Sequence, residues 1–140
     1  GGTNINRYFR RSIRNSWAPL KGRASGPRDA RAAGIACWDA KYYYHYPRPI
    51  QTMPGFKTIL GTPNFPAYTS GHAAFSGAAA EVMAHFFPSN ASQFRTWAEE
   101  AAMSRIYGGI HYSFDASAGL TQGRQAAAYS IAKAKLDGID

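Results

Sequence analysis

The sequence predicts an all-α protein, folded as a bundle of helices, and three observations support this. Apolar residues recur at helical spacing between Pro- and Gly-rich breaks, and no segment alternates polar and apolar residues as a half-buried strand does. The 140 residues, 45% hydrophobic and 17% charged, suffice for one compact domain with one sizeable core.

Residues 1–30 are expected to form a basic arm in front of a helical domain of residues 31–140. Asn4 can cap a short amphipathic helix, and residues 17–27 are expected to be a connecting loop. The apolar stripe of this helix would hold Ile5, Tyr8, Phe9, Ser12 and Ile13. Residues 1–31 carry eight basic residues, which are Arg7, Arg10, Arg11, Arg14, Lys21, Arg23, Arg28 and Arg31. Such a charge run can contact nucleic acid or an anionic membrane, but a solvated face or a cover for an acidic partner is the simpler interpretation.

Four longer helices are expected in the domain. The first covers residues 28–45 and ends before Pro47. Its buried side would include Ala32, Ile35, Ala36, Trp38 and Tyr43. Residues 49–68 should be irregular, because prolines interrupt them throughout.

The other three helices follow the irregular segment. A helix of small residues covers residues 71–87 and is ended by Pro88. The next is capped by Ser92 and ends near Tyr107, before two glycines. An Ala-rich helix over residues 111–136 has Gly119 and Gly123 as weak points, because glycine disfavours helix interiors.

The composition excludes several classes of protein. The longest uncharged stretch, residues 58–80, contains two prolines and a histidine, so no transmembrane segment is expected. Cys37 is the one cysteine, which excludes an internal disulfide framework and a cysteine-based zinc site. The chain starts with Gly rather than Met, so we expect a processed chain or a piece of a longer one.

Lys41 and Arg48 form the first chemical motif. They lie seven residues apart, nearly two helical turns, so both can point into one site from the end of the same helix. Taken alone, two surface cations near a helix C-terminus are the simpler interpretation, because the helix dipole favours them there.

The second motif is the tripeptide Ser70-Gly71-His72 at a predicted helix N-terminus. Free N–H groups and the positive end of the dipole favour anion binding there, and Gly71 lets an anion approach the main chain closely. An ordinary Ser cap followed by a packed histidine is an equally good interpretation of these three residues alone.

Arg105, His111 and Asp115 form the third motif. If a helix starts near His111, Asp115 lies one turn further on the same face. Its carboxylate can hold a proton on one imidazole nitrogen and leave a lone pair on the other, as in an activated nucleophile or metal ligand. An exposed His–Asp pair is the alternative.

Together the motifs spell K-x6-RP, SGH and SR-x5-H-x3-D in that order. Over residues 38–115 this pattern closely resembles the signature of the type-2 phosphatidic acid phosphatase and vanadium-dependent haloperoxidase superfamily, whose fold is a helical bundle. Thr69 departs from it, since the family usually has proline before SGH. Thr69 removes no functional group, so the resemblance implies an intact site.

The resemblance implies a site for phosphate or vanadate in residues 31–140, the catalytic domain. The oxyanion would be bound by Lys41, Arg48, Ser70, Gly71 and Arg105. His111 would be the nucleophile or the vanadium ligand, with Asp115 orienting it, and His72 would be the acid–base residue.

The resemblance is greatest to the haloperoxidase-like branch, of which the chain looks like the C-terminal catalytic half. This implies oxidation of halide by hydrogen peroxide at a histidine-ligated vanadate. Trp38 and Phe65 would line a halide pocket, although core packing is the simpler interpretation of two aromatics. The alternative is an acid phosphatase that hydrolyses phosphate monoesters through a phosphohistidine without a cofactor.

A non-catalytic or nucleic-acid-binding module is a third hypothesis. The complete catalytic set disfavours the first form, and the basic arm offers only Tyr8, Phe9 and Trp17 for stacking on bases. Because haloperoxidases are normally longer, a missing N-terminal helical region or a homo-oligomer is expected. Family resemblance favours a secreted or periplasmic location.

Overall fold

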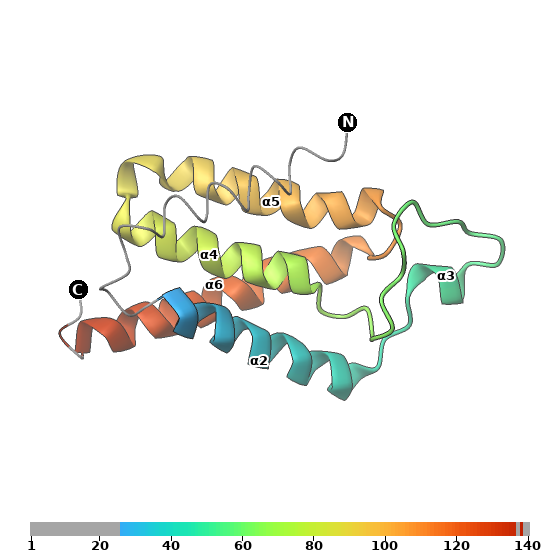
Figure 1. The fold of residues 1–140 in the computed structure, drawn as a ribbon, viewed down its shortest axis with the longest axis horizontal. Helices are drawn as coiled ribbons and strands as arrows, with labels where there is room; N and C mark the ends of the chain where they lie inside the picture. Colours follow the sequence, from blue (N-terminus) through green and yellow to red (C-terminus); the bar gives the residue numbers. More distant parts are fainter. Residues whose placement is uncertain (1–25, 137, 139–140) are drawn as a thin grey trace.

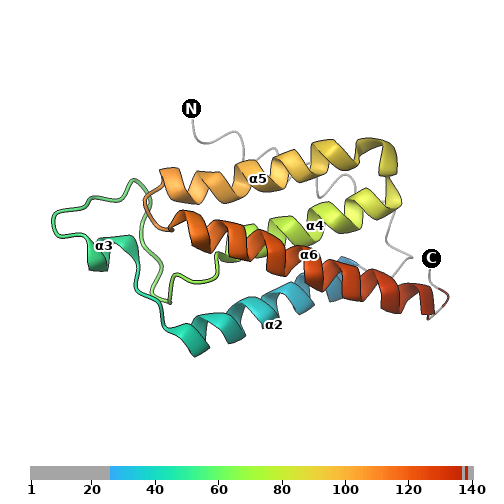
Figure 2. The same cartoon turned by 180° about the vertical axis from the view of Figure 1, so that it is seen from behind.

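The computed structural model describes residues 26–136 and residue 138 (Figures 1 and 2). The described part contains no β-strand, which confirms the predicted all-α fold. Its elements are α2 (Gly26–Tyr44), α3 (Pro49–Thr52), α4 (Gly71–Phe86), the 3₁₀ turn η2 (Pro88–Asn90), α5 (Ala91–Tyr107) and α6 (Ser113–Leu136). No helix among these residues is long and apolar enough to cross a membrane.

The predicted helix after Asn4 and most of the predicted loop over residues 17–27 lie outside the described residues. Gly26 and Pro27, expected in that loop, instead begin α2. The division expected between residues 30 and 31 therefore falls inside a helix. The basic arm itself stays a prediction.

α4 lies at the centre of the bundle, in contact with α2, α5 and α6 (Figures 1 and 2). Small residues make this possible: nearly all of its buried positions are alanine, serine or glycine. A Cβ added at Gly119 would lie 2.6 Å from the carbonyl oxygen of Ser70, and one at Gly123 would overlap the carbonyl of Ala74. The two glycines are therefore the points where α6 meets the backbone of α4. The prediction treated them only as weak points of the helix and did not include this packing contact.

The buried face of α2 differs from the predicted one. Ile35 and Tyr43 are 65% and 79% exposed, and Trp38 is 37% exposed. The buried residues are Ala33, Cys37 and Lys41, which follow one another at four-residue spacing. Lys41 explains this difference, because its ammonium donates hydrogen bonds to carbonyls inside the protein. Ala33 and Cys37 lie on the same face of α2 as Lys41 and are therefore buried as well.

Two helix starts also differ from the predictions. α5 begins at Ala91, directly after the 3₁₀ turn that Pro88 opens, so Asn90 rather than Ser92 precedes it. α6 begins at Ser113 rather than at His111. Its third residue, Asp115, accepts a hydrogen bond from the amide of Tyr112 at 3.1 Å, as in a capping box, and this fixes the start of the helix.

The long connection from α2 to α4 lies at one end of the bundle (Figure 1). It is irregular as predicted, apart from the single turn α3. The ends of α2 and α5 and the starts of α4 and α6 meet this connection, so all three sequence motifs lie at the same end of the molecule (Figures 1 and 2).

Candidate active site

Lys41 lies in the last turn of α2 and is completely buried. Its Nζ donates to the carbonyl oxygens of Pro66 at 2.8 Å, Ala67 at 3.0 Å and Thr69 at 2.6 Å. An ammonium has three donors, so these carbonyls use all of them. Burial lowers the pKa of Lys41 to about 8, and the nearby charge of Arg48 acts in the same direction. Lys41 thus supplies a charge to the site while it holds the loop before α4.

Arg48 is also buried, and it reaches the site from the residue before α3 rather than from α2 as expected. Its Nε donates to the carbonyl of Phe65 at 2.9 Å and its Nη1 to the carbonyl of Ile110 at 2.7 Å. Its Nη2 is buried without a hydrogen-bond partner among the described residues. A buried charged donor of this kind is costly unless an acceptor meets it, so the arginine is suited to an anion.

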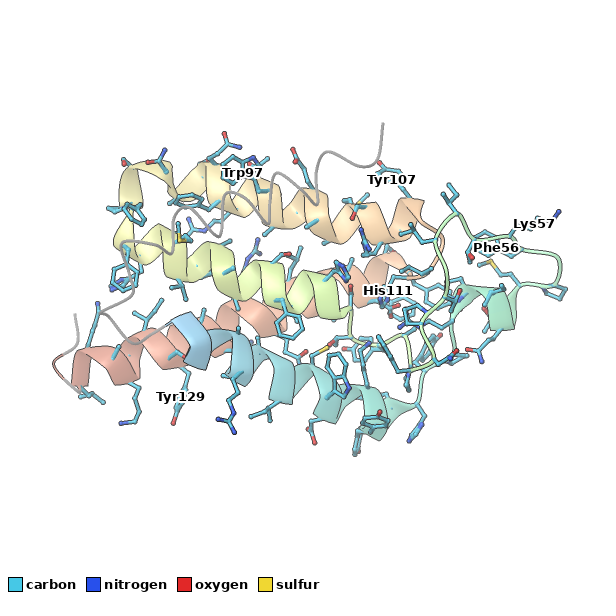
Figure 3. All side chains as sticks on the ribbon, in the orientation of Figure 1. Phe56, Lys57, Trp97, Tyr107, His111 and Tyr129 are labelled. Carbon is cyan, nitrogen blue, oxygen red and sulfur yellow. The ribbon has the colours of Figure 1, made fainter. Side chains whose placement is uncertain are left out.

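His111 lies between Arg48 and Asp115, at the end of the bundle where the long connection runs (Figure 3). Its Nδ1 is 2.9 Å from Oδ2 of the buried Asp115, and its Nε2 is 3.0 Å from Nη1 of Arg48. Because a guanidinium can only donate, Nε2 must accept, and Nδ1 then carries the proton given to Asp115. Burial lowers the pKa of His111, which keeps the ring neutral, and Asp115 opposes this shift. The contact between His111 and Asp115 is therefore formed as their spacing predicted, although α6 starts two residues later.

Ser70, Gly71 and His72 open α4 as predicted. Ser70 is buried, and its Oγ accepts the amide of Ala73 at 3.4 Å, the usual geometry of an N-cap. Its own amide donates to the carbonyl of Asp115 at 3.0 Å, which ties the start of α4 to the start of α6. His72 lies in the first turn of α4 and is exposed.

Arg105 is not brought into the same cluster by hydrogen bonds. It lies half-buried in the last turn of α5, and burial lowers its pKa. Its Nε donates to Oγ of Ser104 at 3.0 Å, while its carbonyl accepts the amide of Ile110 at 3.2 Å. The residue next to His111 is thereby attached to Arg105 through the main chain.

Trp38 and Phe65 contact each other, with ring centroids 5.5 Å apart. The ring of Phe65 also faces both buried cations: Nζ of Lys41 is 5.2 Å and Cζ of Arg48 is 5.1 Å from its centroid. Phe65 is therefore a wall of the cationic cluster, and Trp38 lies behind it.

Sequence reasoning missed the contribution of Gln122. Its Oε1 accepts a hydrogen bond from Oγ1 of Thr69 at 2.6 Å, and its Nε2 donates to the carbonyl of Ala36 at 2.9 Å. No motif contains Gln122, and a glutamine inside an Ala-rich helix carries no signal of its own. It also missed the carbonyls that bind Lys41 and Arg48, since main-chain atoms leave no trace in residue identity.

The donor set fits an oxyanion rather than a metal cation. Within the described residues no group of three or more His, Cys, Asp or Glu side chains could hold a metal ion. Arg48 instead offers a buried donor without an acceptor, and His111 offers one nitrogen lone pair beside it. An oxyanion could accept from Nη2 of Arg48, next to the His111 nitrogen that accepts from Nη1.

The chain was compared with known proteins. A family model described as PAP2 superfamily matches residues 30–135, which include every predicted site residue. No curated protein matches. A bacterial vanadium-dependent iodoperoxidase of known crystal structure is 36% identical over 72% of this chain, with a TM-score of 0.66.

The two structural similarities differ in how much of each protein they cover. The chain spans 30% of that iodoperoxidase. The crystal structure of LpxE from Aquifex aeolicus is 16% identical over 94% of this chain and 78% of its own, with a TM-score of 0.73, and shows that the fold is shared. The family match covers most of the chain, and the chain belongs to the PAP2 superfamily, whose members are enzymes.

Proposed function

We propose that this chain is the catalytic part of a vanadium-dependent haloperoxidase, which oxidises halide with hydrogen peroxide. The observation that carries the proposal is the contact between Arg48 and His111. It leaves a neutral histidine with its Nε2 lone pair beside a buried cationic donor that lacks an acceptor. The 36% identity to a bacterial vanadium-dependent iodoperoxidase favours this chemistry.

Each predicted residue has a role in this proposal. Bound vanadate would supply a Lewis-acid centre that activates hydrogen peroxide. Its oxygens would be bound by Arg48, Ser70, Gly71 and Arg105, and vanadium by Nε2 of His111. Lys41 would contribute its charge, because its three donors are used by carbonyls. Asp115 holds the proton on Nδ1 of His111 and so keeps Nε2 available as a ligand.

His72 and the two aromatic residues act on the substrates. His72, exposed in the first turn of α4, would take a proton from hydrogen peroxide and return one to the leaving oxygen. Phe65 and Trp38 would border the halide, because the positive edges of aromatic rings and the adjacent cations both favour an anion.

An acid phosphatase is the second candidate, and the tautomer of His111 favours it. Once the hydrogen bond from Nη1 of Arg48 is given up, the lone pair on Nε2 can attack phosphorus, which forms the phosphohistidine and breaks the bond to the ester oxygen. His72 would give a proton to that oxygen. Water then attacks phosphorus, His72 takes its proton, and the P–N bond breaks to release phosphate. The cationic side chains would stabilise the charge of the transition state.

A paired assay distinguishes the two candidates. Protein freed of phosphate is divided, and one part is loaded with vanadate. We expect triiodide from iodide and hydrogen peroxide only in the loaded part, and little hydrolysis of 4-nitrophenyl phosphate in the other. Rapid hydrolysis without vanadate and no triiodide with it would establish the phosphatase instead. His111→Ala is the control, because both reactions need its Nε2.

A further inference from the structure

Gln122 joins two elements that border the candidate site. Its Nε2 donates to the carbonyl of Ala36 in α2, and its Oε1 accepts the hydroxyl hydrogen of Thr69 at 2.6 Å. The carbonyl of Ala36 can only accept, so the amide has one orientation that satisfies both contacts. At 2.6 Å, Gln122 is the closer acceptor for the single hydroxyl hydrogen of Thr69, whose Oγ1 also lies 3.6 Å from Sγ of Cys37.

Thr69 is held from both sides. Its hydroxyl is bound by Gln122 from α6, and its carbonyl accepts Nζ of Lys41 from α2 at 2.6 Å. The residue is 3% exposed, so water does not replace either contact readily. It directly precedes Ser70 and Gly71, whose main chain starts α4. The position of Thr69 therefore determines where this main chain begins.

The origin of the Gln122 side chain is itself rigid. Gly119 and Gly123, three residues before it and one after it, lie against the backbone of α4 without room for a Cβ. α6 therefore cannot slide along or away from α4 near Gln122 without losing close packing. Because Gln122 projects from this rigid contact, its side chain can hold the loop before α4 in place.

We propose that Gln122 is a positioning residue for the oxyanion site, which acts by holding Thr69 through its hydroxyl. Through Thr69 it sets the carbonyl that binds Lys41 and the place of Ser70 and Gly71 at the start of α4. This inference rests on the oxyanion binding proposed above. It is independent of whether the enzyme oxidises halide or hydrolyses phosphate esters, since both need the same anion site.

The test measures the affinity for inorganic phosphate by calorimetry, at a temperature where every variant is folded. Gln122→Leu and Thr69→Val each remove the hydrogen bond between the two residues at nearly constant volume. Gln122→Leu also removes the bond to the carbonyl of Ala36, and Thr69→Val the contact with Sγ of Cys37. Each should weaken phosphate binding by roughly five- to tenfold, the range expected for one hydrogen bond. The loss in the double variant should be clearly less than the sum of the single losses, because both variants remove the shared interaction. Thr69→Ser keeps the hydroxyl and should restore the affinity.

Gln125→Leu is the matched control, since it is an exposed glutamine on the same helix. It should bind phosphate like the unmodified chain. If Gln122→Leu only lowers the melting temperature and leaves the affinity unchanged, Gln122 is structural and the inference is wrong. Additive losses in the double variant would also overturn it. If the unmodified chain binds neither phosphate nor vanadate, the proposed oxyanion site itself fails, and the inference fails with it. Should Gln122→Leu not fold, Thr69→Val compared with Thr69→Ser decides the matter alone.

Discussion

Arg48 and His111 contact each other inside the candidate site, with Nη1 of the arginine 3.0 Å from Nε2 of the histidine. The contact selects the tautomer of His111, because the guanidinium requires an acceptor. The nitrogen that would reach vanadium or phosphorus is therefore the one that Arg48 already holds unprotonated. In the proposed site, Arg48 would act both on the anion and on the residue that binds it.

Arg48→Lys should weaken binding of phosphate and vanadate by roughly tenfold or more. Lysine keeps the charge but cannot reach Phe65, Ile110 and the anion at once, as the fork of a guanidinium does. Calorimetric titration with each oxyanion measures the loss. Arg95→Lys is the control, because Arg95 forms a surface ion pair with Glu81. Equal affinities for the two variants would contradict the role of Arg48.

The two histidines of the motifs should fail differently. His111→Ala should abolish phosphoester turnover and greatly weaken vanadate binding, because the nitrogen that would bind phosphorus or vanadium is lost. His72→Ala should lower turnover by about 10²–10⁴ and keep much of the affinity, since a proton-transfer residue does not hold the anion. Vanadate affinity and turnover are measured for both. The roles are reversed if His72→Ala loses vanadate and His111→Ala keeps it.

Sulfate binding should weaken as the pH rises through about 8. Burial lowers the pKa of Lys41 to about 8, so its ammonium is charged below this pH and neutral above it. Sulfate keeps its charge over the whole range, so the change reports on the protein. Titrations from pH 6.5 to 9.5 at constant ionic strength measure it. Cys37→Ala should keep the dependence but move it to lower pH, because the charge interaction with Cys37 raises the pKa of Lys41. An affinity that is constant over this range would contradict the assignment to Lys41.

Gly123→Ala should destabilise the fold by about 1–3 kcal/mol, as measured by urea unfolding. Alanine alone would favour the helix by about 1 kcal/mol, but its Cβ would overlap the carbonyl of Ala74, which is fixed within α4. Gly61→Ala is the control, because a Cβ there meets nothing within 4 Å. A Gly123→Ala variant as stable as the unmodified chain would show that α4 and α6 are not in close contact.

Much of the fold was predictable from the sequence because Pro and Gly mark where helices stop. α4 ends just before Pro88, and α5 ends just before Gly108 and Gly109, as expected. The buried face of α2 was predicted wrongly, because an apolar stripe was assumed where Lys41 lies inside. A lysine is placed outside by any hydrophobicity pattern, and only its three carbonyl partners explain its burial.

The candidate site likewise contains one contact that the sequence predicted and one that it did not. The spacing of His111 and Asp115 indicated their contact, since the two residues lie one turn apart. Gln122 was invisible, because its partner Thr69 is 53 residues away in the sequence. Contacts of this range depend on how α6 packs against α4, which residue types alone do not encode.

The carbonyls that hold Lys41 and Arg48 have a consequence for how this enzyme can diversify. Both cations are anchored to main-chain oxygens of residues 65, 66, 67, 69 and 110, not to side chains. The positions of the two charges therefore depend on the path of the main chain, while the side chains at these residues have contacts of their own. Phe65 packs against both cations, Thr69 bonds to Gln122, and Ala67 and Ile110 are buried. An enzyme of this kind can diversify at these residues only through substitutions that keep the path of the main chain.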